Sequence, residues 1–376
     1  MQTAHHSSHS QHRHVLIQVL VLAAIAVGLW WAGQAIHDKL APKGIATGFD
    51  FLWSRAGFDL SESVIDYDGS KTYAYALLAG FLNTLKVALC AIVLSVLLGL
   101  LAALAQLSQH DLANRIAKLY VAVIRNTPLL LQLFFWFSIF TVSMPSTREA
   151  INPVPGWYLS NRGIDFPWPT PIVLVTIVAT LCALGAGIRA RALAGEGAPG
   201  RGRRPFLILC ALATALAVYA FGSGQFRFEW PSASTFSIIG GGHVSPEFLS
   251  MFVGLSVYTG TYIAEAIRGA VQSISQGQVA AGHALGLNRS GVLRYIVMPQ
   301  AIRIAMPAVI SELLNLVKNS SLGVAVGYPE LVSAGNTAMN QTGQAIELIA
   351  IYMVVYVSVN FLTTRLIGIW ERRYAW

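Results

Sequence analysis

Long apolar runs constrain this chain more than any other feature of its sequence. A helix needs about 20 apolar residues, within a range of about 17 to 25, to cross the hydrocarbon core of a bilayer, because each residue rises about 1.5 Å. Several runs reach this length, and they predict an all-α integral membrane protein with about eight transmembrane helices. The runs lie near 15–36, 77–107, 128–144, 171–188, 206–222, 248–268, 299–322 and 346–369.

Composition supports this class of protein. Hydrophobic residues make up 55% of the chain and charged residues only 11%, whereas about a quarter of an ordinary soluble domain is charged. The net charge of +8 is scattered over short loops, which argues against a nucleic-acid-binding face. Three cysteines, Cys90, Cys182 and Cys210, fall inside apolar runs, so they predict apolar packing rather than a disulfide framework or a metal site.

The distribution of Lys and Arg predicts the orientation of the spans. Basic residues gather in the loops after the second, fourth and sixth runs and in the tail at 371–376, and such loops face the cytoplasm. Both termini are therefore predicted to be cytoplasmic, and 37–76 to be periplasmic. The acidic residues of that segment suit a soluble partner, but an ordinary solvated loop is favoured. The first run ends in Trp30 and Trp31 and is expected to remain as a helix rather than to be cleaved as a signal.

Two polar segments outside the spans have simple interpretations. Residues 1–14 are rich in irregularly spaced histidines, and a disordered cytoplasmic lead is favoured over a metal site. The glycine-rich stretch GEGAPGRGRRP lacks the Lys and the hydroxyl of a phosphate-binding loop, and no glycine in the chain directly precedes a Lys. If ATP powers this protein, another chain must hydrolyse it. No catalytic residue, metal ligand or cofactor site is predicted.

A polar loop, QVAAGHALGLNRSGVLRYIVMP, lies between the sixth and seventh runs. Its first part, 278–285, predicts a short helix that ends at Gly286 in a left-handed turn. Ser290 is then predicted to cap a second short helix at 291–298. Two short helices joined by a glycine turn on the cytoplasmic side indicate a docking device, with an ordinary interfacial hairpin as the alternative.

This loop resembles the EAA loop of binding-protein-dependent ABC importer permeases. The family pattern is Glu-Ala-Ala, three residues, Gly, nine residues, Ile, one residue, Leu-Pro. Gly286, Ile296 and Pro299 keep that spacing and Met298 replaces the Leu, but the Glu position is Ala280. The stretches YIAEAIRGAVQSISQGQ, PQAIRIAMP, LLNLVKNSSLG and RNTPLLLQLFFW are similar to the polar-amino-acid branch. The extra spans most resemble the larger permease of broad-specificity L-amino-acid importers.

The resemblance implies a type I ABC importer permease core over 77–370. It would carry an extra N-terminal helix at 15–36, an insertion at about 145–245 that holds a helix pair, and a coupling loop at about 269–299. The implied partners are a cytoplasmic ABC ATPase dimer that binds ATP and Mg, a second homologous permease and a periplasmic amino-acid-binding protein, at a bacterial inner membrane. The missing Glu favours a heterodimer. The residues that would contact the ATPase are Gln278, Ala280, Ala281, Gly282, Gly286, Leu287, Ile296 and Pro299.

Polar residues within the seventh run form a candidate substrate path. Glu312, Asn315 and Asn319 recur at helical spacing, and Lys318 lies on the neighbouring flank. A zwitterionic amino acid needs a cationic and an anionic partner, and charged groups inside spans are costly unless they serve such a purpose. A Glu to Lys bridge that merely joins two helices is an equally weighted alternative.

Other charges have plainer interpretations. Glu265 and Arg268 are predicted to form an intrahelical pair, which is slightly favoured over a gate, and Lys86 is expected to extend toward water at the outer end of its span. The stretch DLANRIAKLYVAVIRNTP predicts an interfacial helix that ends at Arg125, followed by Thr127 as N-cap and Pro128 as the first residue of the next helix.

Two other classes of function compete with a transport subunit. A secondary transporter or channel that works without an ATPase would predict internal repeats, and the sequence shows none that is convincing. A membrane enzyme would need a cluster of catalytic or metal-binding groups, yet the histidines outside the N-terminal lead are dispersed.

Overall fold

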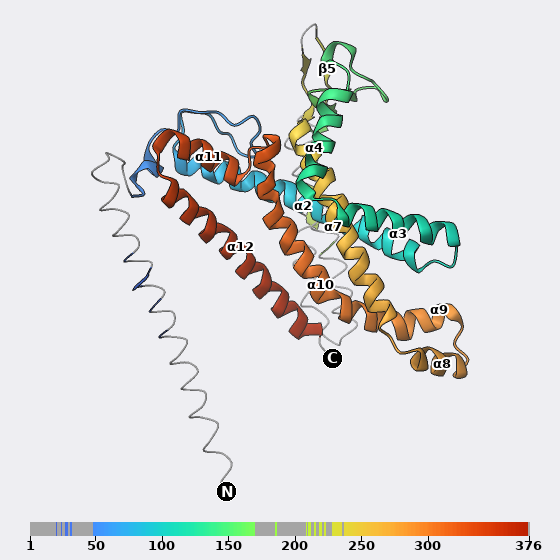
Figure 1. Cartoon of the computed structure of the whole chain (residues 1–376). Helices are drawn as coiled ribbons and strands as arrows, with labels where there is room; N and C mark the ends of the chain where they lie inside the picture. Colours follow the sequence, from blue (N-terminus) through green and yellow to red (C-terminus); the bar gives the residue numbers. More distant parts are fainter. Residues whose placement is uncertain are drawn as a thin grey trace. The chain divides into compact units, whose positions relative to one another are not determined.

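The computed structural model describes residues 48–169, 228–234 and 237–374, together with single residues between 20 and 31 and between 185 and 222 (Figure 1). The predicted N-terminal lead, the first span, and the fourth and fifth spans therefore lie outside the described residues. The chain divides into two compact units. The outer-sequence unit comprises the chain up to Lys86 and again from Pro329, and the central unit is Val87–Tyr328.

Helices dominate both units. The outer-sequence unit contains a 3-10 turn η2 (Asp50–Trp53), the first part of α2 (Tyr73–Leu107), α11 (Leu331–Thr342) and α12 (Ala345–Tyr374). The central unit contains the rest of α2, then α3 (Asp111–Asn126), α4 (Leu129–Ser138), η3 (Ile139–Ser143), η4 (Thr147–Glu149), α7 (Pro246–Gln272), α8 (Gln276–Ala284), α9 (Arg289–Val292), η5 (Leu293–Val297), α10 (Met298–Asn319) and η6 (Ser320–Val326).

Three helical segments in the described part of the chain are long and apolar enough to cross a membrane. They are α2, the continuous segment from Arg289 to Val326, and Ala345–Arg365 of α12. The bent pair of α3 and the α4–η3 segment, which meet at 103°, counts as a fourth if it is one span. These helices confirm the predictions near 77–107, 299–322 and 346–369, and α7 confirms a helix over 248–268. The total of eight spans stays a prediction.

The insertion departs from the all-α prediction because its described parts contain short strands. A three-stranded antiparallel sheet has the order β1-β2-β7, and two further antiparallel pairs join β3 to β4 and β5 to β6. His243 pairs with Asp165 across β2 and β7, with 2.8 Å between Nδ1 and Oδ1. Strands of two to four residues leave no readable periodicity in a sequence. The strands are β1 (Tyr158–Ser160), β2 (Gly163–Phe166), β3 (Trp168–Pro169), β4 (Phe228–Glu229), β5 (Ser232–Ala233), β6 (Ile238–Ile239) and β7 (Gly242–Val244).

The core of the central unit forms where α7 packs against α4 and α10 (Figure 1). Leu133, Leu255 and Leu316 are fully buried there, one from each helix. Glycines allow α2 to approach α7 closely: a Cβ atom at Gly99 would lie 2.6 Å from Cγ2 of Ile263 and 3.0 Å from the carbonyl oxygen of Gly260. Small residues at helix crossings serve the same purpose in other membrane proteins.

The entry into α4 differs from the prediction. Thr127 does not cap α4: its hydroxyl donates to the carbonyl of Val123, 2.9 Å away, and so closes α3. Pro128 is the N-cap residue and Leu129 begins α4. Proline lacks an N–H and has a fixed φ, so it terminates α3 and turns the chain without a side-chain cap.

The outer-sequence unit has its own core and a buried polar hub. Asn83 accepts a hydrogen bond from the backbone N–H of Val64 at 3.1 Å and donates to the carbonyls of Glu62 and Pro329, each at 2.8 Å. The side chain of Lys86 is paired with Glu62, so the lysine is held by the segment before α2 rather than simply extended into water. The predicted periplasmic segment is thus fastened to its helix by specific contacts.

Glu330 is a buried acid at the start of α11. Its two carboxylate oxygens accept hydrogen bonds from the backbone N–H groups of Val332 and Ser333, at 2.9 and 2.8 Å, which satisfies two donors that every helix start leaves free. Burial nevertheless raises the pKa of Glu330 to about 8, because desolvation outweighs those hydrogen bonds.

The raised pKa of Glu330 predicts a pH-dependent stability. Between about pH 4.5 and pH 8 the folded chain keeps the proton that the unfolded chain releases, so the free energy of unfolding falls as pH rises through this window and levels off above it. Thermal unfolding in detergent, followed from pH 5 to pH 9, measures this slope. We expect Glu330→Gln, which cannot titrate, to reduce the slope. An identical slope in both proteins would contradict the assignment to Glu330.

Candidate functional site

A helical hairpin connects α7 to α10 and corresponds to the predicted docking loop (Figure 1). Its first helix, α8, occupies Gln276–Ala284, and Gly286 follows in a left-handed conformation with φ of 80°. Both features confirm the predicted helix and glycine turn. The second helix begins earlier than predicted because Asn288, not Ser290, is its N-cap: Oδ1 of Asn288 accepts from the N–H of Gly291 at 2.8 Å.

The second half of the hairpin also differs from a separate short helix. After α9 (Arg289–Val292), the π-helical segment η5 (Leu293–Val297) leads directly into α10. The helical segment from Arg289 to Val326 is therefore 38 residues long. Pro299 is the second residue of α10 and lies at the junction between the π-helical η5 and the α-helical α10.

Gly282 is the contact point between the two halves of the hairpin. It is buried, and a Cβ atom there would lie 2.5 Å from Cδ1 of Ile296 and 3.1 Å from Cγ2 of Val292. Ile296 packs in turn against a core that joins the hairpin to α7 through Ala270 and to α10 through Ala301. The predicted coupling residues therefore separate into a packing pair, Gly282 and Ile296, and an outward set.

The outward set presents small and apolar groups. Gln278, Ala280, Ala281, Gly286 and Pro299 are exposed, and Leu287 is half-buried. Leu285, which the sequence analysis did not single out, has 82% of its surface exposed at the tip of the turn. An exposed leucine beside alanines and a glycine gives the hairpin an apolar tip.

A hydrogen bond connects the hairpin to the rest of the central unit. Nη1 of Arg289 donates to Oε1 of Gln109 at 2.7 Å, and Gln109 lies in the turn between α2 and α3. Within the hairpin, the side chain of Gln300 donates to that of Gln278 at 2.6 Å. The hairpin is thus positioned by polar contacts at its base as well as by its apolar core.

A line of polar side chains follows one face of α7. The hydroxyls of Tyr258 and Tyr262 are 3.0 Å apart, and the half-buried Glu312 lies on α10, the helix that packs against α7. The guanidinium of Arg125, at the end of α3, lies 4.8 Å from the centre of the Tyr262 ring. Such a cation–π contact holds the cation over the ring.

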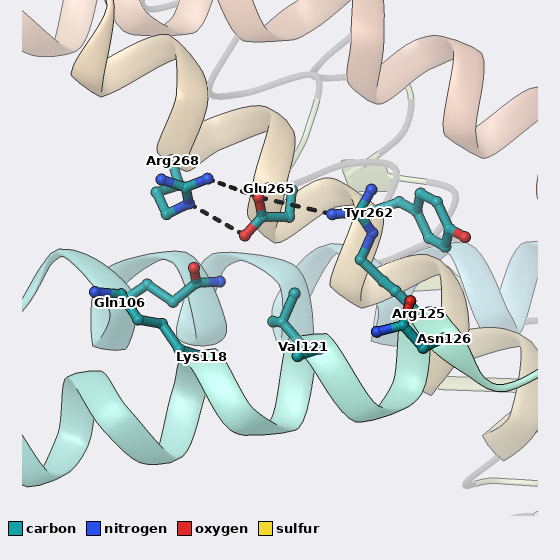
Figure 2. Close-up of a pocket in the computed structure, with 9 residues that line it drawn as sticks. Gln106, Lys118, Val121, Arg125, Asn126, Tyr262, Glu265 and Arg268 are labelled. Carbon is teal, nitrogen blue, oxygen red and sulfur yellow. Dashed lines mark hydrogen bonds and ion pairs between the residues drawn. The ribbon is translucent and has the colours of Figure 1, made fainter.

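The line ends in a cluster of ion pairs (Figure 2). Arg268 donates from Nε and Nη2 to the two carboxylate oxygens of Glu265, at 3.1 and 2.7 Å. This confirms the predicted intrahelical pair. Nη1 of Arg125 lies 3.7 Å from Oε2 of Glu265, so two arginines share one carboxylate. The predicted interfacial helix therefore places Arg125 against α7, a contact that the sequence analysis did not predict.

The other predicted path residues lie on α10. Glu312 and Asn319 are half-buried, whereas Asn315 and Lys318 are exposed. Within the described residues neither Glu312 nor Lys318 makes an ion pair, and both the substrate path and the alternative of a Glu to Lys bridge between two helices stay predictions. Asn315 and Lys318 are available to a partner or to a solute.

A comparison with known protein families identifies the family of this chain. Residues 95–376 match the family described as "Binding-protein-dependent transport system inner membrane component". The chain belongs to this family. It is a membrane component of a transport system rather than an enzyme.

Relatives match this transport component over nearly its whole length. A "General L-amino acid transport system permease protein AapQ" of Rhizobium johnstonii is 38% identical over 94% of this chain and 90% of its own. A "Putative amino-acid ABC transporter permease protein YhdX" of Escherichia coli is 36% identical over 96% and 93%. A "Glutamate/glutamine/aspartate/asparagine transport system permease protein BztB" of Rhodobacter capsulatus is 33% identical over 96% and 93%.

The sequence analysis did not identify all of the polar residues on this face of α7. Tyr258, Tyr262 and Glu265 recur at i, i+4 and i+7, which places them on one helix face. That spacing could have predicted a shared polar face, but tyrosines in an apolar run resemble ordinary packing residues. The contact between Arg125 and Glu265 could not be predicted from the sequence, because it depends on how α3 crosses α7.

Proposed function

We propose that this chain is the permease subunit of an ATP-driven amino-acid importer in a bacterial inner membrane, with both termini in the cytoplasm. The observation that carries the proposal is the glycine-packed hairpin between α7 and α10, in a chain of which a relative matches 94%. A secondary transporter has no need of such a hairpin. Amino acids are proposed as the substrate because the names of the relatives refer to amino-acid transport.

The hairpin is the proposed contact with the ATPase. Its exposed tip, formed by Ala280, Ala281 and Leu285, has the small and apolar groups that fit a groove in a partner with backbones close together. ATP and Mg would be bound by that partner, not by this chain. A second homologous permease with an intact Glu in its own loop, and a periplasmic amino-acid-binding protein, complete the proposed assembly.

Glu312, Asn315, Lys318 and Asn319 form the proposed substrate path. Glu312 offers an anionic partner to an ammonium group, and the exposed Lys318 offers a cation to a carboxylate. The two asparagines supply both donors and acceptors. The hydroxyls of Tyr258 and Tyr262, on the α7 helix that packs against α10, add further polar groups.

The variant Glu312→Gln tests this path. The substitution keeps the shape of the side chain and removes its charge, and a hydrogen bond to a charged group contributes about 1.5 to 3 kcal/mol. We therefore expect uptake to fall about 10-fold to 100-fold in proteoliposomes that contain the full complex. Ser311→Ala is the matched control, because the hydroxyl of Ser311 donates to the carbonyl of Pro307 on its own helix and, among the described residues, to no other group. Equal uptake by Glu312→Gln and the wild type would exclude Glu312 from the path.

Purification from the native membrane in mild detergent tests the proposed function as a whole. We expect an ATPase and a second permease to remain bound at stoichiometric ratio, and amino-acid uptake in liposomes to require ATP and the binding protein. A chain that is purified alone and moves solute without ATP would overturn the proposal in favour of a secondary transporter or channel.

A further inference from the structure

Helix α3 has the surface of a helix that lies in a membrane interface. Its apolar residues divide between a buried face, with Ala117 and Val121 packed against α2 and α7, and an exposed face. A polar flank lies beside the exposed face and carries Arg115 and Lys118. Helices of this kind lie at the boundary between headgroups and acyl chains. The exposed apolar side chains are Leu112, Ile116, Leu119 and Val123.

A cavity of about 530 Å³ opens between this flank of α3, the end of α2 and the last turns of α7 (Figure 2). Its charged lining consists of Lys118, Arg125 and Arg268 against the single carboxylate of Glu265. Three cations and one anion leave a net charge of two positive units. The polar lining also includes the side chains of Gln106 and Asn126, which can donate hydrogen bonds.

The charges of the cavity are only partly neutralised by the chain itself. Glu265 is engaged by both Arg268 and Arg125. Lys118 lines the cavity, is exposed, and makes no ion pair within the described residues. A lysine beside two arginines that share one carboxylate makes the cavity a site for an added anion.

An apolar groove lies on the opposite flank of the same helix. It measures about 350 Å³ and runs between α2 and α3, with Leu98, Leu101, Ile116 and Tyr120 in its lining. Helix α3 therefore has hydrocarbon-compatible surface on one side and a cationic cavity on the other. This arrangement matches the two parts of a phospholipid, and the charge of the cavity matches a phospholipid with an anionic headgroup.

We infer that this cavity binds the headgroup of an anionic phospholipid, whose acyl chains cover the exposed apolar face of α3. Basic cavities between membrane helices on the cytoplasmic side bind such headgroups, and the loop charges place α3 on that side. The lipid would neutralise Lys118 and hold α3 against α7 next to Arg125. The inference rests on the proposed orientation of the chain in the membrane but not on the solute that the complex carries, so its failure would leave the transport proposal intact.

The test counts lipids that remain bound to the full complex. The complex is reconstituted in nanodiscs of equal parts phosphatidylglycerol and phosphatidylcholine, extracted into mild detergent, and analysed by native mass spectrometry. We expect the wild type to retain phosphatidylglycerol in preference to phosphatidylcholine. Lys118→Gln should lower the retained phosphatidylglycerol about five-fold, the effect of one basic residue near a membrane surface. The matched control is Arg115→Gln, on the same helix but outside the cavity, which should change retention little.

Three results would overturn the inference. Equal retention of the two lipids by the wild type would remove the need for an anionic headgroup. Equal losses in Lys118→Gln and Arg115→Gln would indicate diffuse attraction to the membrane surface. Release of the retained phosphatidylglycerol by inorganic phosphate alone would make the cavity a site for a free anion.

Discussion

Gly282→Val is expected to reduce ATP-dependent uptake strongly while the transmembrane helices remain folded. A Cβ atom at this position would already lie 2.5 Å from Cδ1 of Ile296 and 3.1 Å from Cγ2 of Val292. The Cδ1 atom of Ile296 can rotate away, but the two further methyl groups of a valine would also meet the β-branched side chain of Val292, which has few alternative rotamers. We therefore expect α8 to move away from the α9 side of the hairpin. Because interfaces depend on a few well-packed groups, a displaced α8 should lose the proposed ATPase. We expect more than about 10-fold lower uptake, which corresponds to a loss of about 1.4 kcal/mol.

The same substitution at Gly277 is the control for this experiment. Gly277 is in α8 as well, and a Cβ atom there meets nothing closer than Oγ of Ser275, at the ordinary distance of 3.5 Å. Gly277→Val carries the same intrinsic helix propensity without the steric conflict. The measurements are ATPase retained on purification and uptake in proteoliposomes. If both variants retain the ATPase equally, the packing at Gly282 does not position the docking surface.

Gly99→Val is expected to destabilise the central unit rather than to affect docking. The atoms that its side chain would meet belong to rigid parts of α7: the Cβ of Ile263 at 2.8 Å and the carbonyl oxygen of Gly260 at 3.0 Å. Neither can rotate away, so the helices must separate. Overpacking of this kind costs about 1 to 3 kcal/mol, and we expect a clearly lower unfolding temperature of the detergent-purified complex.

Gly269→Val serves as the control for helix propensity. Gly269 is on α7, and nothing lies within 4 Å of a Cβ atom built there. Fluorescence-monitored thermal unfolding of both variants and the wild type separates the two effects. If Gly99→Val and Gly269→Val unfold at the same temperature, the close crossing of α2 and α7 at Gly99 would be contradicted.

The apolar helices and the glycine turn were predictable because each depends on local rules. The length of the run near 77–107 predicts α2, and Gly286 marks a left-handed turn that other residues rarely adopt. The start of α9 was predicted wrongly because Asn288 and Ser290 compete as caps. Asparagine is at least as good an N-cap as serine, and here the earlier residue holds the amide of Gly291.

The candidate site was only partly predictable, for a different reason. Glu312 and Asn319 could be placed on one helix from their spacing, but their neighbours come from other helices. Arg125 lies 140 positions before Glu265 in the sequence, and only the crossing of α3 and α7 brings them to 3.7 Å. The strands of the insertion escaped prediction because they have two to four residues each.

The two ends of the docking hairpin join their neighbouring helices in different ways. On one side, α9 continues through η5 and α10 to Val326 without a break. On the other side, α7 ends at Gln272, and three residues that belong to no helix separate it from α8. A displacement of the hairpin would therefore pass into α10 through continuous helical backbone, whereas its link to α7 consists of residues 273–275 and of the buried side chain of Ile274. Glu312 lies on that continuous segment, beyond Pro307, so the docking surface and the proposed substrate path belong to one helical element.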